Sequence, residues 1–103
     1  METIQLSLEQ FTSVMLAAGY DQVTERVWAA NAVLEEHTHP FEANAIVVQG
    51  EVVLGLTGSE PRRLTVGDTF HVLANTPHTE VYGSEGATYW VARKGQIPQA
   101  IAV

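Results

Sequence analysis

Three histidines carry the strongest chemical signal in this sequence. His37 and His39 are two residues apart, and His78 follows a Thr-Pro turn further along the chain. Side chains two positions apart on an extended strand point to the same side, with Cα atoms about 6.5–7 Å apart. A returning strand that brings His78 alongside them would gather three imidazoles at one point. Imidazole nitrogens bind iron, manganese, nickel, copper and zinc, so the pattern predicts a divalent transition-metal site.

Glu80 and His71 are the next residues of chemical interest. Glu80 lies two residues after His78, so on an extended strand both face the same way. Its carboxylate has three possible roles: it binds the metal, acts as a catalytic acid or base, or lines the pocket. We expect His71 at the rim of the barrel or in a supporting role, donating to a carboxylate that orients a ligand. The alternative is that the histidines are core residues with satisfied nitrogens and no metal.

Charge and composition exclude several classes of protein. The chain has 103 residues, a formal net charge of −7 and no cysteine. Nucleic-acid binding needs clustered cations, and the basic pairs Arg62-Arg63 and Arg93-Lys94 are typical of solvated strand ends. The absence of cysteine excludes disulfides and thiolate ligands. With no apolar run of membrane length and no signal-peptide pattern at the start, we expect no membrane partner and a cytoplasmic protein.

The elements that must position the histidines are mostly short strands. Ser7 and Gln10 form a capping box for a short helix with an apolar stripe, which Gly19 ends. After Tyr20, about eight short strands alternate with turns, which is typical of an all-β sandwich or barrel. We therefore predict a single domain over residues 1–103, with a helical segment (1–20), a β-barrel (21–94) and a tail (95–103). The exposed sheet edges and the apolar residues of the helix and tail predict a homodimer.

Two motifs in this chain resemble those of the cupin superfamily. The first family motif is Gly, five residues, His-x-His, three or four residues, Glu, six residues, Gly. The second is Gly, five residues, Pro-x-Gly, two residues, His, three residues, Asn. His37, His39 and Gly50 match the first motif in residue type and spacing, and Gly67 and His78 match the second. The positions that differ in residue type are Asn31, for the first Gly, and Leu73, Asn75 and Tyr82, for the Pro, Gly and Asn.

The resemblance implies a double-sheet jelly roll and a carboxylate ligand close to the His-x-His pair. The family glutamate would fall at Ala43, and Glu42 is its neighbour. A slip of one residue turns a side chain to the opposite face, so Glu42 reaches the metal only if the chain bulges after Pro40. On that condition we expect Glu42 as a fourth ligand, and Glu80 or Glu42 as the catalytic proton carrier.

The sequence leaves three functions open. The first is a metal-dependent oxygenase, isomerase or lyase that acts on a small polar molecule. The second is a non-catalytic module that binds or senses a small ligand. The third is a metal-free barrel with a structural or binding role. The residues do not decide whether the protein is an enzyme, and they do not select one metal.

Overall fold

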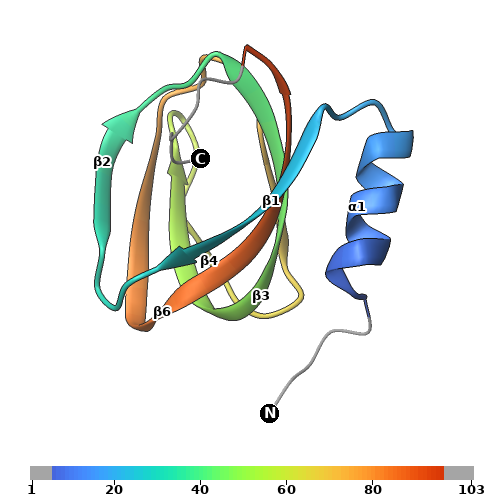
Figure 1. The fold of residues 1–103 in the computed structure, drawn as a ribbon. Coiled ribbons are helices and arrows are strands. Elements are labelled where there is room, and N and C mark those ends of the chain that lie inside the picture. Colours follow the sequence, from blue (N-terminus) through green and yellow to red (C-terminus); the bar gives the residue numbers. More distant parts are fainter. Residues whose placement is uncertain (1–5, 97–103) are drawn as a thin grey trace.

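The computed structural model describes residues 6–96, which form one helix and six strands. The elements in chain order are α1 (Leu8–Ala17), β1 (Gln22–Trp28), β2 (Val33–His37), β3 (Phe41–Leu56), β4 (Arg62–Leu64), β5 (Thr69–Val72) and β6 (His78–Gly95). All the strand pairs are antiparallel, and the strands curve around a common interior (Figure 1). The all-β jelly roll with an N-terminal helix is therefore confirmed.

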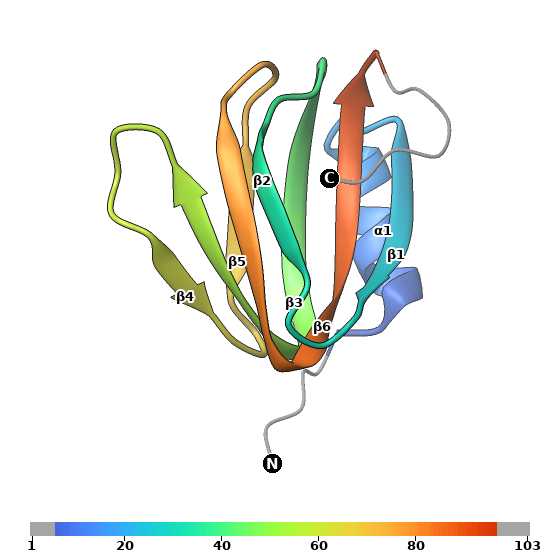
Figure 2. The same cartoon turned by 90° about the vertical axis from the view of Figure 1, so that its left-hand side faces the viewer.

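The barrel is organised by two long strands, β3 and β6, that pair along their length. The first half of β3 and the second half of β6 form one sheet with β1 and β5. Their other halves form a second sheet with β2 and β4. Figure 2 shows the two layers facing each other. The sequence predicts a series of short strands in these regions. In the structure, β3 and β6 each continue through a bend and contribute to both sheets.

Gly50 makes this bend possible. The pairing of β3 with β6 shifts register around Gly50, and its φ is +73°. A Cβ atom at this position would lie 2.1 Å from the carbonyl oxygen of Gly86, so two backbones meet where only glycine fits. Asn31 and Asn75, which stand where the motifs have glycine, have φ values of 59° and 62°. Asparagine therefore takes over the left-handed conformation at both turns.

The inner faces of the two sheets form the core. The buried apolar members are Ala43, Ala45, Val47, Val52, Leu54, Leu64, Phe70, Val72, Tyr82, Ala87, Tyr89 and Val91. These residues alternate with more exposed ones along the strands, as expected for a sheet with one wet face. Because His78 and Glu80 lie four and two residues before Tyr82 on β6, they face the same interior.

The helix α1 has the predicted capping box, in which Ser7 and Gln10 bond each other's backbone N–H. It docks through Phe11, whose ring lies 6.1 Å from that of Trp90 on the outer face of β6. The predicted apolar stripe is only partly covered, because Val14 stays 57% exposed. Within the described part of the chain, no helix has the length and apolar character needed to cross a membrane. The apolar tail invoked for dimerisation lies largely in residues 97–103, outside the described residues.

Candidate metal centre

The three predicted histidines meet at one end of the barrel interior. His37 ends β2 and pairs in register with His78, the first residue of β6. His39 lies in the connection to β3 and is fully buried. The ring centroids of His37 and His78 are 4.2 Å apart, and that of His39 lies 4.9 Å from His78 and 6.3 Å from His37. Long-range strand pairing therefore gathers imidazoles that are far apart in the sequence.

Each imidazole is oriented by a backbone carbonyl two residues away. The Nδ1 atoms of His37, His39 and His78 lie 2.8, 2.9 and 2.8 Å from the carbonyl oxygens of Glu35, Phe41 and Thr76. A carbonyl only accepts a hydrogen bond, so Nδ1 carries the proton in each ring. In the neutral imidazole the lone pair is then on Nε2, which is the arrangement of histidines that bind metals.

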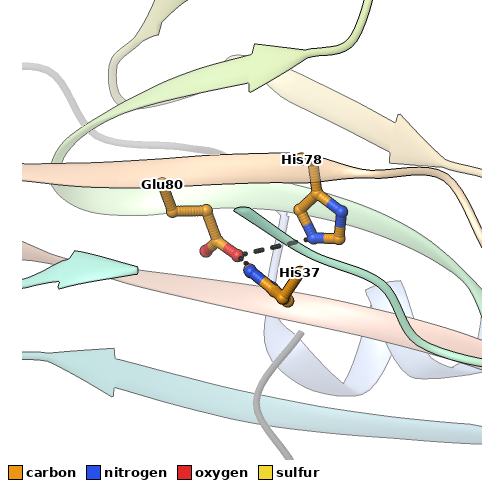
Figure 3. A group of neighbouring side chains, drawn as sticks. All are labelled: His37, His78 and Glu80. Carbon is orange, nitrogen blue, oxygen red and sulfur yellow. Dashed lines mark ion pairs between the residues drawn. The ribbon is translucent and has the colours of Figure 1, made fainter. Parts of the chain in front are cut away.

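Glu80 completes the group from the face of β6 that it shares with His78. Its Oε2 atom lies 3.5 Å from Nε2 of His37 and 3.7 Å from Nε2 of His78, as Figure 3 shows. Its Oε1 atom accepts a hydrogen bond from the hydroxyl of Tyr82 and a longer one, 3.4 Å, from Tyr89. The two phenols thus hold one carboxylate oxygen and turn the other toward the imidazoles.

The spacing of these donor atoms fits a transition-metal ion. One ligand atom from each of His37, His78 and Glu80 lies within 4.8 Å of the others. Two ligands bound about 2.1 Å from a tetrahedral ion are about 3.4 Å apart, close to the separations that Glu80 makes with both rings. His39 is outside this group, but its Nε2 atom is buried without a hydrogen-bond partner among the described residues. The donor set therefore fits a metal, with His39 beside it.

Burial sets the electrostatics of the group. Removal from water raises the pKa of Glu80, and the hydrogen bond from Tyr82 and the nearby charge of His37 only partly oppose this. Burial also lowers the pKa of His39, which keeps that ring neutral at physiological pH. A buried carboxylate beside these imidazole nitrogens is stabilised by a cation between them, and this is the environment that favours metal binding.

Glu42 does not join the histidines. The register between β3 and β6 runs one to one from Phe41 to Val47, so no bulge turns the Glu42 side chain inward. Phe41 and Ala43 face the core, and Glu42 faces the outside. There its carboxylate pairs with His71, which lowers the pKa of Glu42, and lies 3.8 Å from Nζ of Lys94. The chain does not bulge after Pro40, so the condition for Glu42 as a ligand is not met, and the carboxylate that His71 contacts lies on the outer side of β3.

The structure also places residues at the site that the sequence analysis did not single out for it. Tyr82 and Tyr89 support Glu80, and Nε1 of Trp28 donates to the Tyr89 hydroxyl at 2.9 Å. Arg93, expected at a solvated strand end, is only 5% exposed and faces the interior. The signal that would have found it is alternation, because Tyr89, Val91 and Arg93 share one face of β6.

A match to a known sequence profile shows the family of this chain. The sequence profile described as "Cupin domain" matches residues 25–92, so the chain belongs to the cupin family. No curated protein matches it.

Among solved structures, the DMSP lyase DddQ from Ruegeria pomeroyi is similar, with 26% identity and a TM-score of 0.64, over 76% of this chain and 39% of that one. KdgF from Halomonas sp. has 26% identity and a TM-score of 0.61, over 72% of this chain and 69% of that one. An RmlC-like cupin from Shewanella frigidimarina, at 23% identity and a TM-score of 0.62 over 73% of this chain and 67% of that one, shows the shared fold. The chain spans only 37% and 39% of the lengths of two similar DMSP lyases.

Proposed function

We propose that this cupin binds one divalent transition metal through His37, His78 and Glu80, with His39 as a further ligand. The observation that carries the proposal is the anchoring of all three Nδ1 atoms by backbone carbonyls. This anchoring puts the lone pairs on Nε2, and those of His37 and His78 face the buried Oε2 of Glu80. Without a cation or a proton between them, these lone pairs would repel each other.

We further propose that the protein is a metal-dependent enzyme acting on a small polar molecule. A divalent ion held by imidazoles and a carboxylate supplies a Lewis acid with open positions for a substrate oxygen. The side chain of His37 is 28% exposed, whereas those of His78 and Glu80 are buried, so substrate approaches from the side of His37. Burial raises the pKa of Tyr82, so its hydroxyl stays protonated and keeps holding Glu80. The reaction class is an oxygenase, isomerase or lyase.

A non-catalytic ligand-binding or sensing role is the second candidate. It is supported by the position of Glu80, because Oε1 accepts from Tyr82 and Oε2 would bind the proposed ion. A carboxylate that accepts from Tyr82 and also binds an ion has no proton to transfer. Ligand binding without turnover, across a panel of small carbonyl and hydroxy compounds, would favour this role over the enzyme.

A homodimer remains part of the proposal. Val33 on β2 and Val81 on β6 are opposite each other and are 64% and 43% exposed, on the outer face of the barrel. A second copy covering this apolar pair would remove it from water. Light scattering should give twice the chain mass, and a strictly monomeric mass at about 50 μM would contradict a dimer of even moderate affinity.

Metal analysis of the purified, untagged chain tests the proposed centre. After supplementation with zinc or iron and removal of free ions, we expect about one ion per chain. The variants His37→Ala, His78→Ala and Glu80→Gln should each lower this content, whereas His71→Ala on the outer face is the matched control. A metal content below about a tenth of an ion per chain in the wild type would contradict the proposal.

A further inference from the structure

The imidazole of His39 lies flat against the phenyl ring of Phe41. The two ring centroids are 4.0 Å apart, and the ring planes differ by only 3°. Both side chains are fully buried. Aromatic rings in contact attract each other and exclude water, so this arrangement holds the imidazole against one flat surface.

Phe41 also holds His39 through its backbone. Nδ1 of His39 donates a hydrogen bond of 2.9 Å to the carbonyl oxygen of Phe41. The hydrogen bond fixes where Nδ1 lies, and the stacked phenyl ring fixes the plane of the imidazole. Because Nε2 lies in the same plane as Nδ1, the two restraints together fix the direction of the Nε2 lone pair. One residue therefore sets both the tautomer and the orientation of His39.

Arg93 packs on the same phenyl ring from the paired strand β6. Its Cζ atom lies 5.3 Å from the Phe41 ring centroid. Since His39 covers one face of this ring at 4.0 Å, the guanidinium takes the other face. The three side chains form a column in which Phe41 is held between the guanidinium and the imidazole.

Strand pairing explains why the guanidinium reaches the phenyl ring. Gly95 lies directly opposite Phe41 in the pairing of β3 with β6, and Arg93 lies opposite Ala43. Because Gly95 has no side chain, Phe41 is not covered from the directly opposite position, and its diagonal neighbour Arg93 extends over the ring. Nη1 of Arg93 also donates to Oε1 of Gln22 on β1 at 3.4 Å. The guanidinium is therefore anchored behind Phe41 by a third strand.

The column decides where Nε2 of His39 lies. This atom is buried without a hydrogen-bond partner among the described residues. It is outside the group of ligand atoms that lie within 4.8 Å of one another, although the ring centroid of His39 is only 4.9 Å from that of His78. A small rotation of the imidazole therefore changes its distance to an ion held by that group. The surface that limits this rotation controls how well His39 binds the ion.

We propose that Phe41, supported by Arg93, is the positioning residue of His39 and controls whether this imidazole binds the metal ion. The inference rests on the proposed function, in which His39 is a further ligand of the ion. Partners that orient a metal-binding histidine change the metal affinity by about 10–100-fold. An aliphatic side chain in place of Phe41 would keep the site apolar but leave the imidazole plane undefined. The metal affinity and the number of bound ligands should then both fall.

The test is cobalt(II) binding to the intact chain, because the visible absorption of cobalt depends on the number and arrangement of its ligands. The variants are Phe41→Leu, His39→Ala and, as the matched control, Phe11→Leu. Phe11 is also buried, but it packs on Trp90 on the outer face of the barrel. We expect Phe41→Leu to bind cobalt about tenfold more weakly and to shift the spectrum toward that of His39→Ala. Phe11→Leu should keep the wild-type spectrum and an affinity within about twofold of wild type.

A further variant tests the support that Arg93 gives. Arg93→Met keeps the length of the side chain but removes the guanidinium from the Phe41 ring, and it should weaken cobalt binding by about threefold. A folded Phe41→Leu protein with the wild-type spectrum and affinity would overturn the proposal. If Phe41→Leu does not fold, Arg93→Met decides, and an unchanged cobalt affinity in that variant would overturn the proposal. A His39→Ala spectrum equal to that of wild type would contradict both the ligand role of His39 and its control by Phe41.

NMR of the metal-free protein separates this inference from the metal centre. A phenyl ring stacked on an imidazole shifts the ring protons of His39 upfield, and the ring nitrogen signals report the Nδ1–H tautomer. We expect both features in the wild type and their loss in Phe41→Leu. If these results hold but the wild type binds no cobalt, the metal centre is wrong and the orientation of His39 by Phe41 stands. If the wild type binds cobalt but both features persist in Phe41→Leu, the positioning role alone is wrong.

Discussion

The hydroxyl of Tyr82 donates a hydrogen bond to Oε1 of Glu80, and this contact leaves Oε2 directed at His37 and His78. The pair lies two residues apart on one face of β6, so the strand itself sets their relative position. A hydrogen bond that fixes a ligating carboxylate affects metal affinity as well as stability.

Tyr82→Phe should weaken zinc binding by about 10–100-fold, because Glu80 loses the donor that orients it. Competition with a chromophoric chelator measures this affinity. Tyr20→Phe is the control, since its hydroxyl contacts Glu42 on the outer face of the barrel. Equal zinc affinities for wild type and Tyr82→Phe would show that the phenol does not support a metal ligand.

Glu80→Gln should raise the melting temperature of the metal-free protein near neutral pH. Burial raises the folded-state pKa of Glu80 above its ordinary value of 4.5, so its contribution to stability is full below that pH. The contribution is lost as the pH rises through the folded-state pKa, because the buried carboxylate must then ionise. Thermal denaturation from acidic to neutral pH should show that the melting temperature of Glu80→Gln exceeds that of the wild type only as the pH rises. In the presence of zinc the order should reverse, because the wild type alone binds the ion tightly.

Glu42→Gln should leave the zinc affinity within about twofold of wild type, since distant sites act independently. Its effect should be on stability instead. The hydrogen bond with His71 lowers the folded-state pKa of Glu42, so its contribution is present above the ordinary value of 4.5 and is lost as the pH falls through the folded-state pKa. The stability difference between wild type and variant should therefore disappear in acid. A large loss of zinc affinity would restore Glu42 as a ligand.

Gly50→Ala should destabilise the fold by about 2–3 kcal/mol, because the new Cβ would meet the backbone of Gly86 in a left-handed conformation. Gly58→Ala is the matched control. Gly58 also has a positive φ, +83°, but a Cβ there would meet nothing within 4 Å, so about 1 kcal/mol of conformational strain is expected. Chemical denaturation of the two variants measures the difference, and equal losses would show that close approach at Gly50 is unimportant.

Local patterns in the sequence predicted an all-β barrel, whereas the jelly roll came from the resemblance to cupins and the meeting of His78 with His37 depends on long-range strand pairing. Alternation, turn residues and the spacing of His37 and His39 depend on neighbours in the chain. The direction of the Glu42 side chain could not be predicted from its neighbours in the chain, because it depends on whether β3 bulges after Pro40. Pairing with β6 keeps β3 regular there. The burial of Arg93 also depends on tertiary structure. The sequence alone predicts that Arg93 and Lys94 are both solvated, and only the pairing of β6 with β1 decides that Arg93 faces inward.

The most direct test of the metal centre is an anomalous-scattering map from crystals of the zinc-loaded protein. We expect one strong peak per chain, bonded to Nε2 of His37, Nε2 of His78 and Oε2 of Glu80, with Nε2 of His39 as a further ligand. A map without a peak there, or with its main peak between His71 and Glu42, would contradict the account.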